Sequence, residues 1–299
     1  MLISLQKTCS YHRRKNYNII LENFMKTFLI KNRSNFIILA LLILSISGLN
    51  ADISELAKNH GHGNLYPTFF LATSLTFIYI IPFVFLTLYL KKRFNIPSPA
   101  FWMSWLFGLA IPANLASLGN SGLSFILLNL NLPKDFIDNW GGSFTAPFTE
   151  EISKGLVVLL VALLLRQISL KSALVMGMIA GMGFQIVEDR FYIFQDLFQN
   201  NGNGYSMALE RIASSGVSHW VFSGTFALGL IILMSKTTAV SKKQGVFFLL
   251  APVAMHFMWN SPLDFSNIDT VYGTINWLIL LYAFKTVDAL PPEKALVSL

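Results

Sequence analysis

Apolar runs divide this chain, and most are roughly 17–25 residues long, the length of helix that crosses the hydrocarbon core of a bilayer. Charged residues stand in short clusters between the runs. The runs are continuous, which argues against membrane-spanning strands that alternate polar and apolar residues. Only 12% of the 299 residues are charged, against about 25% in a soluble domain. We therefore predict an all-α fold, a polytopic transmembrane helix bundle.

The runs predict about eight helices. They cover residues 36–49, 69–90, 101–118, 146–165, 172–197, 212–234, 245–262 and 271–284. A further apolar stretch, 122–132, is too short to span, and we expect it to lie at the membrane interface or to re-enter. In the fifth run, Gly177 and Gly181 form a G-x-x-x-G pattern, which indicates a face for close helix packing.

Basic residues occupy alternate connections between these runs. By the positive-inside rule, this alternation places both termini in the cytoplasm. The formal net charge of +7 is then a signal of membrane topology, and we predict no nucleic-acid partner. The basic residues of these connections, beyond the leader, are Lys91, Lys92, Arg93, Arg166, Lys171, Lys236, Lys242, Lys243, Lys285 and Lys294.

Three regions follow from this organisation. Residues 1–35 form a basic cytoplasmic leader, 36–286 a transmembrane domain with its motif-bearing core at 146–262, and 287–299 a short cytoplasmic tail. The leader and first run also have the pattern of a signal peptide, with Leu49-Asn50-Ala51 as a loosely matching cleavage site. An uncleaved first helix is the alternative that we favour.

Ionisable residues inside apolar runs are costly, and they are functional candidates by default. Counting about 1.5 Å per residue from the middle of each run places these groups roughly 3–9 Å to the outer side of the bilayer centre. Four helices of alternating direction therefore bring polar groups to one depth, which predicts one shared site. These residues, in chain order, are Glu150, Glu151, Glu188, His219, His256 and Asn260, and Lys154 stands in the same run as the two glutamates.

Local spacing supports a site in the fourth predicted helix. Glu150 and Lys154 are four residues apart, so they share a helix face and can pair. Pro147 suits a first helical turn, which would place both glutamates near a helix N-terminus, where carboxylates are favoured. A structural ion pair of Glu188 with Arg190 or Lys154 is the competing interpretation, and an intramembrane histidine can also serve only as a hydrogen-bond partner between helices.

Four motifs follow one another along the chain: Glu150-Glu151-x-x-Lys154, Gly183-Phe184-x-x-x-Glu188, His219 followed by Gly224, and His256-x-x-Trp259-Asn260. Their order resembles the PrsW family of intramembrane proteases, a relative of the CAAX prenyl protease and bacteriocin-processing group. The resemblance covers about residues 147–261 and departs at Asp189, where the family often has Asn.

This resemblance implies hydrolysis of a peptide bond within or beside the membrane. PrsW itself is similar to a site-1 protease that cuts a membrane-bound anti-sigma factor on its extracytoplasmic side. The resemblance thus implies a membrane-protein substrate, a place in the bacterial cytoplasmic (inner) membrane, and a cut near the side where the depth estimate puts the polar groups.

Two chemistries fit the same residues. In a glutamic-type mechanism, which needs no cofactor, Glu150 or Glu151 deprotonates a water that His219 helps to hold. His256 and Asn260 then stabilise the oxyanion. Asn260 follows His256 by one helical turn, and the related prenyl proteases look like glutamic enzymes, so the sequence slightly favours this form. Supporting roles fall to Lys154, Phe184 and Glu188.

In the metal-dependent form, His219, His256 and Glu188 would hold Zn²⁺ with one position open to water, and Glu151 would be the base. The sequence has no H-E-x-x-H motif. Outside enzymes, the same cluster could serve a proton- or cation-coupled transporter, although we find no inverted repeat of the kind common in such proteins. A membrane scaffold that binds other transmembrane segments is a third reading.

Overall fold

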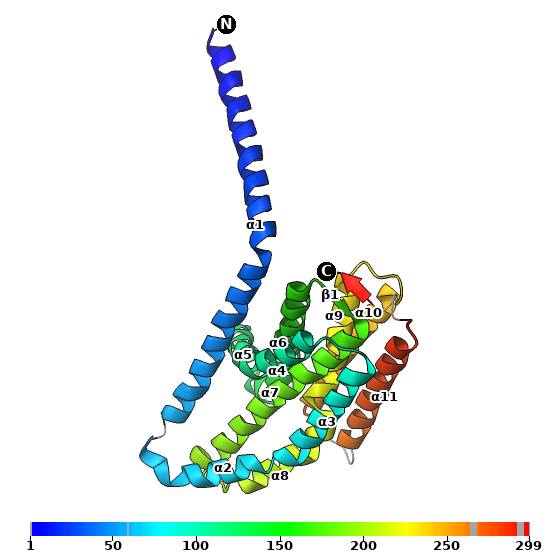
Figure 1. The fold of residues 1–299 in the computed structure, drawn as a ribbon. Helices are drawn as coiled ribbons and strands as arrows, with labels where there is room; N and C mark the ends of the chain where they lie inside the picture. Colours follow the sequence, from blue (N-terminus) through cyan, green and yellow to red (C-terminus); the bar gives the residue numbers. More distant parts are fainter. Residues whose placement is uncertain (1, 59, 264–267, 292–295, 299) are drawn as a thin grey trace. The chain divides into compact units, whose positions relative to one another are not determined.

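The computed structural model describes residues 2–58, 60–263, 268–291 and 296–298, and nearly all of them are helical (Figure 1). The chain divides into two compact units, residues 1–40 and 41–299. The first unit is one stretch of the long helix α1 (Leu2–Ala57), so the predicted leader is helical. The second unit holds all other elements and the predicted polar site.

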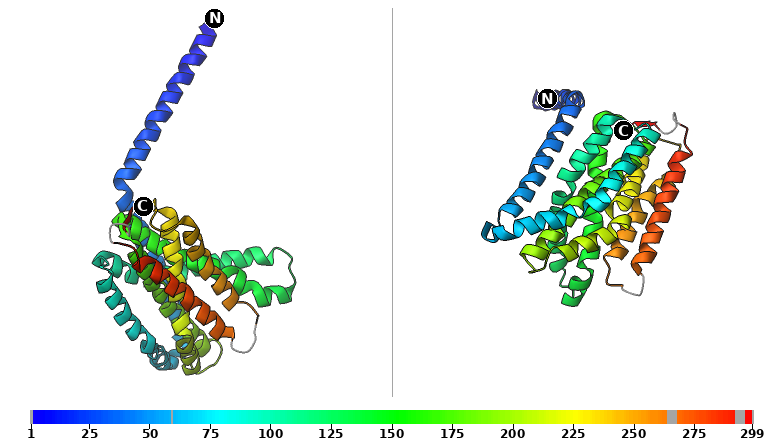
Figure 2. Two further views of the ribbon diagram at one scale, coloured as in Figure 1. Left: turned by 90° about the vertical axis from the view of Figure 1, so that its right-hand side faces the viewer. Right: turned by 60° about the horizontal axis from the view of Figure 1, so that its bottom comes forward.

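The second unit is a bundle of helices, which confirms the all-α prediction (Figure 2). Two 3₁₀ turns interrupt the chain, η1 (His60–Leu65) and η2 (Ser215–Val217). The helices are α2 (Tyr66–Ser74), α3 (Phe77–Arg93), α4 (Ser98–Ala110), α5 (Pro112–Leu128), α6 (Lys134–Leu165), α7 (Leu170–Phe198), α8 (Tyr205–Ser214), α9 (His219–Met234), α10 (Lys242–Trp259) and α11 (Ile268–Asp288).

The second unit also holds two short strands. β1 (Gln167–Ser169) lies in the connection between α6 and α7, and β2 (Leu296–Ser298) lies in the predicted tail. They pair antiparallel, with Ile168 opposite Val297. The tail therefore returns to the α6–α7 connection.

Three helical stretches of the described part are long and apolar enough to cross a membrane: Ile30–Ala57, Leu170–Phe198 and Tyr205–Met234. Counting each of two bent helix pairs as one span raises the number to as many as five. The number of about eight transmembrane helices and the cytoplasmic position of both termini stay predictions. α6 and α10 fall outside this set, and they carry polar groups of the site described below.

The second and third predicted helices are each broken in two. α2 and α3 meet at an angle of 42°, where the Ser74 and Thr76 hydroxyls donate hydrogen bonds to backbone carbonyls three residues earlier. Such bonds compete with regular helix. α4 and α5 meet at 44°, because Pro112 has no N–H to continue the helix. The predicted boundary at residue 118 is wrong, since α5 runs on to Leu128 and takes in most of the stretch 122–132.

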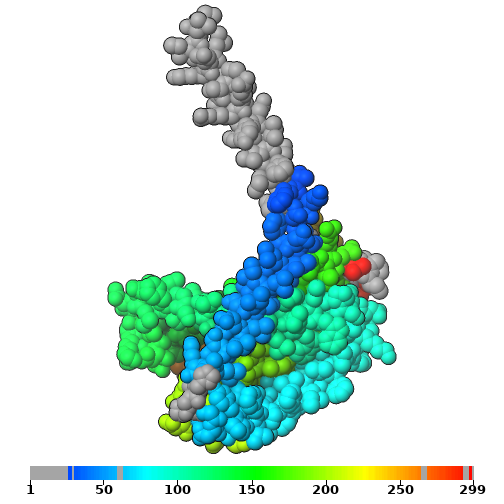
Figure 3. All heavy atoms as spheres, turned by 60° about the vertical axis from the view of Figure 1, so that its left-hand side comes forward, coloured from blue at the N-terminus to red at the C-terminus, as the bar shows by residue number. Residues whose placement is uncertain are grey.

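The fourth predicted helix begins earlier than its apolar run. α6 starts at Lys134, so Pro147 lies inside the helix and not in its first turn. Glu150 and Glu151 are therefore near the middle of α6, and the prediction that a helix N-terminus stabilises them is wrong. The end of α5 and the start of α6 project beyond the neighbouring helices (Figure 3, green).

The centre of the bundle is α7, which packs between α4 and α9. Glycines make both contacts close. A methyl group on Gly181 would lie 2.5 Å from the His219 carbonyl oxygen, and one on Gly177 would lie 2.4 Å from that of Ser223. On the α4 side, a methyl on Gly183 would lie 2.5 Å from the backbone of Gly108. The predicted packing role of the G-x-x-x-G pattern is confirmed.

The basic ends of several helices gather at one end of this unit. Arg93 at the end of α3 pairs with Asp288 at the end of α11, 2.9 Å apart. The Lys171 ammonium, at the start of α7, lies 5.6 Å from the ring centroid of Phe94, which follows the end of α3. The β1–β2 ribbon is at this end too. The clustering agrees with the alternation on which the topology prediction depends.

Candidate functional site

A cavity of about 900 Å³ opens inside the second unit, between the second half of α1 and helices α5 to α10. Its wall includes six of the residues predicted for the site, which are Glu150, Phe184, Glu188, His219, His256 and Asn260. The helices thus bring the predicted polar groups to one place, although they are up to 110 positions apart in the chain.

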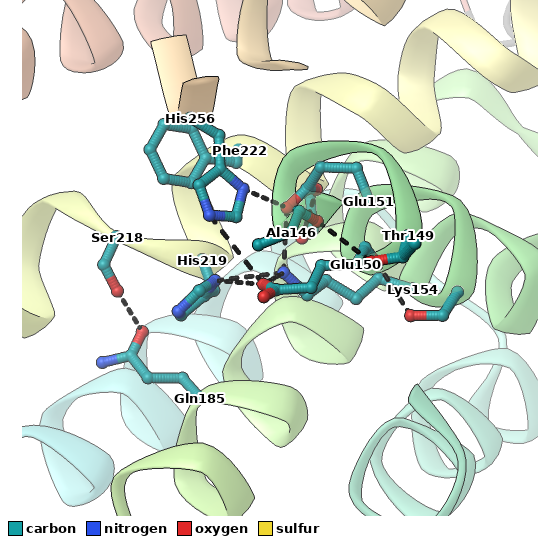
Figure 4. A network of polar contacts seen from close by, with 12 residues as sticks. Ala146, Thr149, Glu150, Glu151, Lys154, Gln185, Ser218, His219, Phe222 and His256 are labelled. Carbon is teal, nitrogen blue, oxygen red and sulfur yellow. Dashed lines mark hydrogen bonds and ion pairs between the residues drawn. The ribbon is translucent and has the colours of Figure 1, made fainter. Parts of the chain in front are cut away.

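Glu150 is the centre of the cluster. Its Oε2 atom lies 3.5 Å from Nδ1 of His219 and 3.9 Å from Nε2 of His256 (Figure 4). These three side chains come from α6, α9 and α10, and each is buried. One donor atom of each lies within 4.8 Å of the other two, an arrangement that could hold a metal ion.

His219 is held through its second ring nitrogen. Nε2 lies 2.8 Å from Oε2 of Glu188, on α7. The Phe184 ring packs against the imidazole at a centroid distance of 4.9 Å. A carboxylate on one nitrogen fixes which nitrogen carries the proton, and it leaves the other free to accept or to bind a metal. Here the other nitrogen is Nδ1, which faces Glu150 and the Lys154 ammonium.

His256 has a matching arrangement. Its Nδ1 atom is 3.4 Å from Oε1 of Glu151, and its ring stacks on Phe222 with centroids 5.0 Å apart. Nδ1 is buried and makes no hydrogen bond of good geometry with any residue that the structure describes. Both histidines therefore turn one nitrogen to Glu150 and the other to a second carboxylate.

Lys154 binds the two glutamates of α6 together. Its ammonium group lies 2.8 Å from Glu151, 3.2 Å from Glu150 and 3.0 Å from Nδ1 of His219. The Ser223 hydroxyl donates a hydrogen bond of 2.8 Å to the other oxygen of Glu151. Neither Lys154 nor Glu151 has any exposed surface. Glu150, not Glu151, is thus the glutamate of this pair that can meet a water in the cavity.

A second charged group supports Glu188 from behind. Arg211, on α8, lies 2.6 Å from Glu188 and 2.5 Å from Asp189. The Tyr79 hydroxyl of α3 donates a hydrogen bond of 2.7 Å to Asp189. The competing interpretation named the wrong partners for Glu188, because Glu188 pairs with Arg211 and Arg190 pairs with Asp52.

Sequence reasoning missed three members of this network: Arg211, Ser223 and Tyr79. Arg211 stands one residue before the predicted helix 212–234, outside every apolar run, so the search for charges inside the runs did not include it. It lies on α8, and the predicted helix 212–234 in fact begins only at His219, after the η2 turn. Asn260 ends α10 as its C-cap residue, and its backbone N–H donates to the His256 carbonyl. Its side chain makes no described hydrogen bond to the cluster.

The residues present fit a divalent metal ion, with one change to the predicted ligand set. Two histidines and a carboxylate are a known set for zinc sites that keep a position open for water. Glu188 contacts the nitrogen of His219 that faces away from His256, so it suits an orienting role. Glu150 contacts the other nitrogen and faces both rings, so it suits the position predicted for Glu188.

Comparison with known proteins gives one match. The model of the PrsW family, described as intramembrane metalloproteases, matches residues 97–287, which is more than half of the chain. No curated protein and no solved structure matches.

Proposed function

Because the chain belongs to the PrsW family of intramembrane metalloproteases, we propose that Glu150, His219 and His256 form its catalytic centre. As a member of this family, the chain is an integral membrane peptidase that acts on a membrane protein. One observation carries the assignment: donor atoms from three helices converge within 4.8 Å on the wall of a cavity of about 900 Å³.

The three side chains would hold a divalent metal ion, and Zn²⁺ suits their donor atoms. A bound Zn²⁺ would polarise the scissile carbonyl and lower the pKa of a bound water. The sequence alone slightly favoured the metal-free form. The family description and the donor set of Glu150, His219 and His256 support the metal-dependent form, which we therefore prefer.

The surrounding residues orient this centre. Glu188 accepts the Nε2 proton of His219, so that the Nδ1 lone pair points towards Glu150. Glu151 stands beside Nδ1 of His256 in the same role. Lys154 offsets the negative charge of both α6 glutamates. Such outer partners typically change metal affinity or activity by about 10–100-fold when they are mutated.

The same geometry could run the metal-free reaction. Oε2 of Glu150 would take a proton from a water in the cavity, and Nε2 of His256 would stabilise the oxyanion. Metal content separates the two forms. A sample with no bound metal and full activity would establish the metal-free reaction and exclude our preference.

We further propose that the cut lies near the extracytoplasmic side. From Glu150 the cavity continues to Trp259, Arg211 and Asp52, whereas the basic connections gather beyond the other end of α6. By the positive-inside rule the basic end is cytoplasmic. Regulated site-1 cleavage of a membrane-bound protein, as of an anti-sigma factor in the bacterial cytoplasmic membrane, fits this side. The family match gives no support to the transporter alternative.

The test compares cells that express the chain with cells that express Glu150→Gln. New protein N-termini in the membrane fraction, identified by mass spectrometry, should appear only with the unchanged chain. A matched control is Glu210→Gln, an exposed carboxylate of α8 outside the cluster. Equal cleavage by the unchanged chain and by Glu150→Gln would contradict the assignment.

A further inference from the structure

A second hollow lies on another side of α9. It is a groove of about 350 Å³, lined mainly by residues of α3 and α11. Leu86 and Leu90 line one wall and Leu280 and Leu281 the other, while Trp220 of α9 lies at its floor. Leu86 and Leu281 are also exposed at the surface of the bundle. In a membrane protein, this surface meets lipid hydrocarbon.

One end of the groove carries charge. Arg93, Lys285 and Asp288 line it there. Asp288 holds the Arg93 guanidinium at 2.9 Å, with both side chains about half exposed. A guanidinium has five N–H donors, so this pair leaves donors for a further ligand. Lys285 is exposed and has no ion-pair or hydrogen-bond partner among the residues that the structure describes. The excess charge at this end is positive.

We propose that this groove binds one phospholipid with an anionic headgroup. An acyl chain would lie between α3 and α11, and the phosphate would contact Arg93 and Lys285. A phospholipid has a long apolar acyl chain with an anionic phosphate at one end. The groove matches it, because its walls are apolar and one end carries the basic residues. The charged end of the groove lies with the other basic connections, where positive-inside topology places the anionic cytoplasmic leaflet.

The floor of the groove connects this lipid to the segment before His219. The Trp220 indole N–H donates a hydrogen bond of 2.8 Å to the Ser215 carbonyl. The Trp277 indole donates one of 3.1 Å to the Gly216 carbonyl. The two indoles touch, with centroids 5.4 Å apart. A lipid acyl chain that packs against these two indole rings would therefore also hold the η2 turn in place.

The experiment measures binding of phosphatidylglycerol and of phosphatidylcholine with matched acyl chains to the delipidated full chain in detergent. Native mass spectrometry gives the bound lipid, and thermal unfolding gives the stabilisation. We expect phosphatidylglycerol to bind more tightly. Arg93→Gln with Lys285→Gln should weaken it roughly tenfold or more, because each basic residue near the headgroup contributes about 1 kcal/mol. Leu281→Trp should fill the groove and block both lipids.

The matched control is Lys236→Gln with Lys243→Gln, an exposed lysine of the α9–α10 connection and an exposed lysine in the first turn of α10. This control removes the same charge outside the groove, so the preference for phosphatidylglycerol should persist. Equal binding of both lipids, or an equal loss in the control, would overturn the proposal. Unchanged lipid binding by Leu281→Trp would do so too. A change of oligomeric state in that variant would identify the groove as a protein interface instead.

Discussion

His219 and Trp220 are neighbours on α9, yet they face two different hollows. His219 lines the polar cavity of about 900 Å³, and Trp220 lines the apolar groove of about 350 Å³. Successive residues of a helix point about 100° apart, so one turn can serve both. The comparison teaches that a single helix turn can line a polar cavity with one residue and an apolar groove with the next.

The two hollows also differ in how their charges are treated. The groove has its charges at one exposed end. The cavity has buried charges, and each has a partner of opposite sign or a histidine: Lys154 with the α6 glutamates, and Arg211 with Glu188 and Asp189. Removing one member of a buried pair leaves the other uncompensated and strongly destabilises the fold. The predictions below test this difference.

Metal removal should have the largest effect of all. It should abolish cleavage, which we assign to the cavity, and leave lipid binding in the groove unchanged. Dialysis against a chelator such as phenanthroline should abolish cleavage, and stoichiometric Zn²⁺ should restore it. Metal analysis of the purified protein should find about one ion per chain, and Glu150→Gln should lose it. Phosphatidylglycerol binding should not change. Full cleavage after complete metal removal would refute the metal-dependent centre.

Substitutions of His219 and Trp220, the two neighbours on α9, should have the next largest effect and should affect the two hollows differently. His219→Gln should lower the rate of cleavage by about 10³-fold or more, because it removes a donor from the catalytic centre. Trp220→Phe keeps an aromatic ring at the floor of the groove and should change the rate less than about threefold. Rates on one purified membrane substrate, with unfolding midpoints as a check on folding, measure both. Similar rate losses would show that the two positions are not functionally separate.

Two lysines of α6 offer a matched test of burial. Lys154 and Lys134 each pair with a carboxylate four residues away, but Lys154 is fully buried and Lys134 is mostly exposed. Lys154→Met should lower the free energy of unfolding by about 3–5 kcal/mol. Lys134→Met should lower it by about 0–1 kcal/mol. Denaturant unfolding in mixed micelles measures both, and equal losses would contradict the account of the buried cluster.

Arg211 should show the smallest of these effects, because it acts through Glu188. Arg211→Gln should reduce activity by about 10–100-fold and weaken metal binding by a similar factor. The reason is that Arg211 holds Glu188, and Glu188 in turn orients His219. The control is Arg190→Gln, which breaks the partly exposed pair with Asp52 and should change activity only a few-fold. Metal affinity measured by competition with a chromophoric chelator distinguishes orientation from loss of folding.

The sequence predicted the members of the cluster better than their arrangement. Glu150, His219 and His256 were evident because ionisable groups are rare inside apolar runs. Which nitrogen of His219 faces which carboxylate depends on tertiary packing, so Glu188 was assigned as a ligand instead of Glu150. Arg211 was missed because nothing in its own segment indicates that α8 folds back onto α7.

The predicted helix boundaries were wrong for a related reason. Pro112 and Pro147 look alike in sequence, but the first separates α4 from α5 and the second lies inside α6. A proline within a membrane helix is tolerated where neighbouring groups satisfy the freed carbonyl. Whether such neighbours exist is decided by the packed bundle. The fold class needed only the apolar runs, and it was predicted correctly.

Gly181 has a consequence for how the chain tolerates change. A methyl group on residue 181 would lie only 2.5 Å from the His219 carbonyl oxygen, so even alanine there would force the backbone of the residue that carries the imidazole to shift. A saturation library selected for proteolysis should therefore retain glycine at 181 as strictly as histidine at 219. A search for reactive groups would pass over this position, since what it supplies to catalysis is the absence of a side chain.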